Sequence, residues 1–123
     1  MLIHVIQYHG PATGSTAGLS APAGIALDVA GRLYVANWCA NSITVYSAGA
    51  TGNASPVTTI GGSNAGLDHP LGIALDTAGR LYVANSFGNS ITVYAAGATG
   101  NVSPVATIAG SNTGLSGPWS MTF

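Results

Sequence analysis

Short hydrophobic runs, separated by Gly, Ser, Asn and Pro, recur along the whole chain. The first four runs cover residues 24–28, 33–36, 43–46 and 57–60. They are rich in β-branched and aromatic residues, and none continues at the 3.6-residue spacing that a helix of ten or more residues would show. The pattern therefore predicts four short strands in this stretch and an all-β protein.

The four runs belong to an internal repeat. Residues 18–65 and 66–113 align without a gap, and 36 of their 48 positions are identical. A third copy begins at residue 114 and covers one strand (114–123), while residues 1–17 resemble the diverged tail of a preceding copy. The chain is therefore expected to hold two full units and two fragments.

Each unit is expected to form one blade of a β-propeller. The runs GIAL, LYVA and ITVY are almost continuously apolar, which indicates sheets that are covered on both faces. Four-stranded antiparallel sheets of 40–50 residues that stack on their neighbours are typical of propeller blades. A small sandwich that arose by duplication is the alternative.

The repeat also resembles a known family. The pattern P-x-G-I-A-x-D-x-x-G-x-x-Y-V-A, at residues 22–36 and again at 70–84, is similar to the NHL repeat of six-bladed propellers. That resemblance implies a propeller fold and a binding platform, although a few NHL relatives are enzymes. The sequence departs from the usual pattern at Asn37 and Asn85, where an Asp is common.

Two blades cannot close a propeller, which needs about four to eight. An isolated pair would leave two blade faces in water, and monomers rarely expose apolar patches of that size. Because the two units are so alike, their head-to-tail contact can recur between chains and close a ring. We expect a homo-oligomer, with a six-bladed trimer favoured over a tetramer or a dimer.

The composition excludes several partners. Only 4% of the residues are charged, with two Arg, no Lys and a net charge of −1, so the chain lacks the basic surface that nucleic-acid binding requires. No apolar run reaches the 18 or so residues of a membrane span, and the first ten residues do not read as a signal peptide. The sequence leaves the cellular location open.

Metal and cofactor sites are not expected either. The chain contains three Asp and no Glu, and Asp28 and Asp76 occupy turns where an Asp typically caps backbone N–H groups. Its single cysteine, Cys39, cannot form a disulfide within the chain. We predict no metal ligands, no cofactor and no catalytic residues.

The candidate binding residues gather at one end of the blades. Antiparallel order puts the loop before the first strand and the loop after the second strand of each unit on one face, which we call the variable loop face. Seven of the twelve differences between the units fall there. Candidate ligand-binding residues on it are Trp38, Phe87, Trp119, Asn37, Asn85, Asp68 and His69. Asn41 and Asn89 are expected nearby as further hydrogen-bonding groups.

The sequence thus favours a non-enzymatic propeller module, natural fragment or engineered, that assembles into a ring and serves as a scaffold or binding platform. One alternative is a lectin-like glycan binder that uses the Trp, Phe and Asn side chains of the variable loop face. Another is a propeller lyase or lactonase with a site at the channel mouth. Asp68 and His69 are adjacent on the variable loop face, and an Asp beside a His can orient an imidazole as a base.

Overall fold

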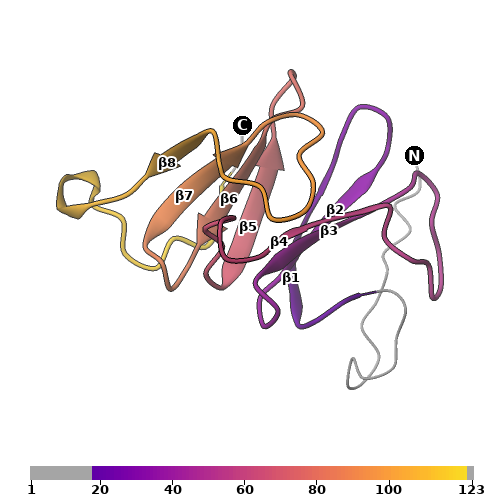
Figure 1. The fold of residues 1–123 in the computed structure, drawn as a ribbon, viewed down its shortest axis with the longest axis horizontal. Helices are drawn as coiled ribbons and strands as arrows, with labels where there is room; N and C mark the ends of the chain where they lie inside the picture. The colour runs from indigo at the N-terminus through magenta and orange to yellow at the C-terminus, as the bar shows by residue number, and fades with distance from the viewer. Residues whose placement is uncertain (1–17, 122–123) are drawn as a thin grey trace.

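The computed structural model describes residues 18–121, which form two four-stranded antiparallel sheets. Figure 1 shows them side by side, blade 1 in purple to magenta and blade 2 in pink to golden yellow. Blade 1 contains β1 (Pro22–Leu27), β2 (Leu33–Asn37), β3 (Ser42–Tyr46) and β4 (Thr58–Gly61), in that spatial order. Blade 2 repeats it with β5 (Pro70–Leu75), β6 (Leu81–Asn85), β7 (Ser90–Tyr94) and β8 (Ala106–Ile108). The prediction of an all-β chain with four strands per unit is confirmed.

A carboxylate organises the turn between the first two strands of each blade. Asp28 Oδ1 accepts hydrogen bonds from the backbone N–H groups of Ala30 and Arg32, at 3.0 and 2.9 Å. Gly31 completes the turn with a φ of 85°, a left-handed conformation that glycine adopts without strain. Blade 2 builds the same turn around Asp76.

The second strands are covered on both faces, as their continuous apolar sequence predicts. All five residues of β2 are buried. A core cluster fills the space between the blades and joins Tyr34, Ile43 and Ile60 of blade 1 to Ile73 and Leu81 of blade 2. The junction between the blades therefore contains most of the hydrophobic core.

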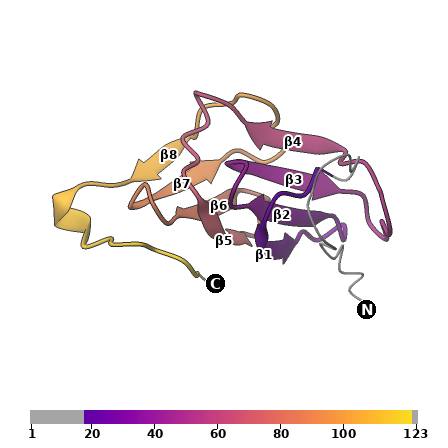
Figure 2. The same cartoon turned by 90° about the horizontal axis from the view of Figure 1, so that it is seen from below.

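Contacts run along the whole junction. At the inner strands, Gly24 of β1 lies so close to β5 that an added Cβ would come within 1.9 Å of the Leu71 carbonyl oxygen. At the outer strands, Gly100 N–H donates to Thr59 O at 2.8 Å. Figure 2 shows β4 running beside the loop that leads from β7 to β8. Only glycine fits at position 24 in this geometry.

The contact that joins the blades recurs beyond blade 2. It consists of a glycine that lies against a carbonyl oxygen of the next segment and an Asn Oδ1 that accepts from a backbone N–H of that segment, and we call it the junction motif. Residues 114–121 form no assigned strand, but their backbone lies beside β5, where a Cβ on Gly72 would come within 2.8 Å of the Trp119 carbonyl oxygen. Asn41 Oδ1 accepts from His69 N–H at 2.7 Å, and Asn89 Oδ1 accepts from Gly117 N–H at 2.8 Å. Residues 114–121 thus lie on blade 2 as β5 lies on blade 1. The expected tail in residues 1–17 falls outside the described residues.

The inner edge of blade 1 has no such cover among residues 18–121. Ile25 is 48% exposed, whereas Ile73, at the same position of blade 2, is 6% exposed. The backbone N–H of Ala21, equivalent to those of His69 and Gly117, has no hydrogen-bond acceptor among the described residues. A second cluster buries Leu33, Val35 and Tyr46 of β2 and β3, so the exposed surface of blade 1 lies along β1.

Candidate functional site

Two loops of each blade meet on the variable loop face, as the antiparallel order predicts. Trp38 N–H donates to Ala21 O at 3.1 Å, and in blade 2 Ser86 N–H donates to His69 O at the same distance. The Ser86 hydroxyl also donates to His69 O, at 2.7 Å. These bonds fix the loop before the first strand against the turn after the second strand.

Three aromatic rings pack together where this face crosses the junction. The His69 ring stacks on Phe87 with ring centroids 4.1 Å apart. Trp38, from blade 1, meets His69 edge-on at 4.4 Å and Phe87 edge-on at 5.5 Å. The cluster therefore contains residues of both blades, and its member Phe87 is 63% exposed.

Asp68 adds a carboxylate to the cluster. Its Oδ1 lies 2.8 Å from His69 Nδ1, and its side chain is 49% exposed. With Nδ1 donating to Asp68, Nε2 carries the lone pair that a general base or a hydrogen-bond acceptor needs. The arrangement can bind a donor or a cation, and it can accept a proton.

His69 has a left-handed backbone conformation. Its φ is 53°, in the left-handed region, where non-glycine residues are uncommon. The equivalent positions carry Ala21 at 47° and Gly117 at 56°. The geometry belongs to the repeat rather than to His69, because Ala21 has it although its N–H bonds no Asn among the described residues, whereas the N–H groups of His69 and Gly117 do. Residues held in such conformations are frequent at functional sites.

Two of the predicted ligand-binding residues do not lie at the surface. Asn37 and Asn85 are both fully buried. Asn37 Oδ1 accepts from Ser20 N–H at 3.1 Å and its Nδ2 donates to Thr44 Oγ1 at 3.0 Å, and Asn85 bonds Asp68 N–H and Thr92 in the same way. Their amides tie the loop before the first strand to the middle of the blade, so they are unavailable to a ligand.

Trp119 stands apart from the ring cluster. It is 72% exposed on the segment of residues 114–121, and no ring contact joins it to another aromatic side chain of the described residues. The predicted set thus divides into four residues that meet, which are Trp38, Asp68, His69 and Phe87, and three that lie elsewhere.

Sequence reasoning missed the roles of Asn41 and Asn89. We expected them to be hydrogen-bonding groups near a ligand, whereas their Oδ1 atoms hold the next blade or its first segment. A signal for this role was present in the sequence, because the Asn-Ser pair after the second strand is identical in both units although the residues before it vary.

The opposite face carries the only arginines. Arg32 Nε lies 2.6 Å from Asp28 Oδ2, and Arg80 Nε lies 2.7 Å from Asp76 Oδ2. Burial raises the pKa of Asp28, but hydrogen bonds and charge from Arg32, with the Ala30 N–H, more than offset it and hold that pKa below its ordinary 3.8.

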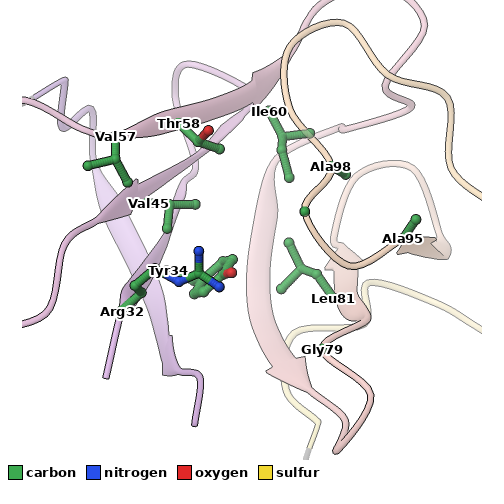
Figure 3. A pocket seen from close by; sticks show the side chains of 11 residues that line it. Arg32, Tyr34, Val45, Val57, Thr58, Ile60, Gly79, Leu81, Ala95 and Ala98 are labelled. Carbon is green, nitrogen blue, oxygen red and sulfur yellow. The ribbon is translucent and has the colours of Figure 1, made fainter. Parts of the chain in front are cut away.

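A narrow hollow opens between the blades on that opposite face. Figure 3 shows Arg32, Tyr34 and Val45 of blade 1 facing Gly79 and Leu81 of blade 2. Its volume is about 110 Å³, and a neighbouring hollow measures about 240 Å³. Both fall below the roughly 300 Å³ at which ligand pockets begin, so we regard them as gaps in the junction packing.

Metal and membrane features are not found in the part of the chain that the structure describes. No group of three or more His, Cys, Asp or Glu side chains there is placed to hold a metal ion. No helix of residues 18–121 is long and apolar enough to cross a membrane.

Stacked four-stranded antiparallel sheets, with loops of both blades meeting on one face, define a β-propeller fragment. The family model described as "Lactonase, 7-bladed beta-propeller" matches residues 2–115. The chain therefore belongs to this lactonase-type propeller family. A search of curated proteins finds no match to it. The NHL type inferred from the repeat pattern stays a prediction.

Proposed function

We propose that the chain is a non-enzymatic propeller unit that closes into a ring with copies of itself and presents its variable loop face as a binding platform. The recurrence of the junction motif carries this proposal. In this motif an Asn Oδ1 accepts from the backbone N–H of a residue in the left-handed conformation, and a nearby glycine lets the two backbones approach closely. The same motif joins blade 2 to blade 1 and residues 114–121 to blade 2.

Blade 1 offers the matching half of that contact along β1. Ala21 has the left-handed φ of 47°, its N–H is directed to no acceptor among the described residues, and Ile25 is half exposed. A blade that supplies an Asn, a glycine and an apolar surface would cover this edge as blade 1 covers β5. Blade 2 of another copy contains all three, and its own residues 114–121, which bond Asn89 and lie against Gly72 in the single chain, would have to give way to β1.

The number of blades decides the number of chains. Three chains give six blades, the number that the NHL-like pattern favours, and four chains give eight. Seven blades, the number in the family description, cannot be made from whole pairs in a symmetric ring. We therefore favour the trimer.

Sedimentation equilibrium over a hundredfold range of protein concentration tests the proposal. A trimer of the 12.1 kDa chain would have a mass of about 36 kDa, and a tetramer one of about 48 kDa. The mass should rise to one of these values and stay there. A mass that remains at that of one chain throughout would refute ring closure by copies.

Lactone hydrolysis is a second candidate, favoured by the family match and by the Asp68–His69 pair. Asp68 would orient the imidazole, and His69 Nε2 would accept a proton from the water that attacks the lactone carbonyl. The imidazolium would then return a proton to the ring oxygen as the ring C–O bond breaks and the hydroxy acid forms. Hydrolysis of a panel of sugar lactones, followed by pH-stat, should then fall at least tenfold in His69→Ala. Hydrolysis equal to the uncatalysed rate, or unchanged in that variant, would exclude this site.

A further inference from the structure

We propose that Trp38, His69 and Phe87, together with the carboxylate of Asp68, form a binding site for an organic cation such as a quaternary ammonium group. The site lies within one chain, at the junction of its two blades, so it goes beyond ring closure and does not depend on it.

The rings supply the aromatic surface that such a cation requires. His69 stacks on Phe87 at an interplanar angle of 29°, and Trp38 stands at 83° to Phe87, so two nearly perpendicular walls meet. Phe87 is 63% exposed although His69 covers part of it, which leaves ring surface open to a ligand. The face of an aromatic ring attracts a cation within about 6 Å of its centre.

Asp68 supplies the matching charge. Its backbone carbonyl accepts from Phe87 N–H at 3.4 Å, and a Cβ on Gly88 would lie 3.2 Å from the Asp68 Cβ, so its side chain stands next to the turn that carries Phe87. Oδ1 bonds His69, and Oδ2 has no partner among the described residues. The carboxylate is half exposed and can pair with a ligand.

No protein cation competes for this carboxylate among the described residues. Arg32 and Arg80 are the only Arg or Lys residues of the chain, and each pairs with the Asp of a turn on the opposite face. An anionic ligand would meet Asp68 with no counter-charge nearby. The charge distribution therefore favours a cation.

The same geometry disfavours the lectin-like alternative. A sugar needs several directed polar groups around it. The amides of Asn37 and Asn85 are buried, and the Oδ1 atoms of Asn41 and Asn89 hold backbone N–H groups. A quaternary ammonium group needs no hydrogen bond, only aromatic surface and a negative charge.

The cluster is specific to this junction rather than a property of the repeat. The blade 1 residues equivalent to Asp68, His69 and Phe87 are Ser20, Ala21 and Cys39, and the blade 2 residue equivalent to Trp38 is Ser86. Two of these blade 2 side chains, His69 and Phe87, thus pack against the one Trp of blade 1, and the third, Asp68, bonds His69. Drift at separate loops would not require them to meet.

Choline, titrated against its neutral isostere 3,3-dimethylbutan-1-ol, tests the proposal. The chain has two Trp residues, so Trp119→Phe leaves Trp38 as the only indole reporter. In this background, choline should change the Trp38 fluorescence saturably, with an affinity at least about threefold above that of the isostere, the range of an exposed cation–π contact. Equal affinities, or no saturable signal from choline, would overturn the proposal.

Two variants on exposed side chains assign the site. Phe87→Leu keeps an apolar side chain but removes the ring, and Asp68→Asn keeps the shape but removes the charge. Each should weaken choline binding about threefold and leave the isostere unaffected, with circular dichroism confirming the fold. Unchanged choline affinity in both variants would place the ligand elsewhere and refute the assignment. Sedimentation of the same samples reports ring closure separately.

Discussion

Ile25 and Ile73 occupy the same position in two nearly identical blades but differ in their surroundings, and this makes them a matched pair for mutagenesis. Ile73 is 6% exposed within the cluster between the blades, whereas Ile25 is 48% exposed at the inner edge of blade 1. We predict that Ile73→Ala is strongly destabilising and that Ile25→Ala is not, in the unassembled chain.

The magnitudes follow from the burial of each side chain. The substitution removes three carbon atoms, and each buried methylene contributes about 0.8 kcal/mol, so Ile73→Ala loses about 2.4 kcal/mol of transfer free energy. The cavity left in a packed junction raises this loss to about 3–4 kcal/mol. At Ile25 half of the surface is already in water and no closed cavity forms, so the loss is about 1 kcal/mol.

Urea denaturation of both variants at low protein concentration measures these free energies of unfolding. Repeating it at high concentration adds a test of assembly, because a ring that buries Ile25 makes the cost of Ile25→Ala grow toward that of Ile73→Ala. If both variants lose the same free energy at low concentration, the inner edge of blade 1 is covered in the single chain and the reasoning fails.

Three further predictions concern the junction, the buried amides and the carboxylates. Gly24→Ala places a Cβ 1.9 Å from a carbonyl oxygen and should cost about 3 kcal/mol in urea denaturation, while Gly61→Ala, which copies the residue of the second unit, should change stability by less than about 1 kcal/mol; equal effects would contradict the junction geometry. Asn85→Ala removes a fully buried amide and should lower the free energy of unfolding by about 2–4 kcal/mol, and a loss near zero would exclude its structural role. The pKa values of Asp28 and Asp76 in the folded chain lie below 3.8, so both carboxylates contribute to the free energy of unfolding. This contribution is complete above the pKa of the unfolded chain and is lost as the pH falls through the lower pKa of the folded chain. Acid denaturation curves that are the same after Asp28→Asn and Asp76→Asn would refute this.

Most of the blade architecture could be predicted because the repeat shows the same pattern twice. The strands begin and end within one or two residues of the hydrophobic runs, since Asp-turns and Asn-turns stop them at fixed places. The Asp28–Arg32 pair follows from the turn as well, because a five-residue hairpin connection brings its first and last side chains together.

The site was harder to predict because a polar side chain near a loop can bond either a ligand or the backbone of its own protein. Asn37 and Asn85 look like surface amides in a sequence, yet each ends a buried strand and satisfies backbone groups of the loop beside it. The meeting of Trp38 with His69 depends on how the two blades are placed, which no local pattern encodes. The identical Asn-Ser turns are the one sequence feature that bears on the placement of the blades, because Asn41 of the first turn bonds the His69 N–H.

Ring closure requires that the inner edge of β1 accept a blade from another copy in the way that β5 accepts blade 1. A crystal structure of the purified chain tests it most directly. We predict an Asn Oδ1 of a neighbouring copy within about 3 Å of Ala21 N–H, the usual N–H···O distance, with Ile25 buried beneath that copy in a closed ring. Copies that meet through other surfaces, with Ile25 still exposed to solvent, would contradict it.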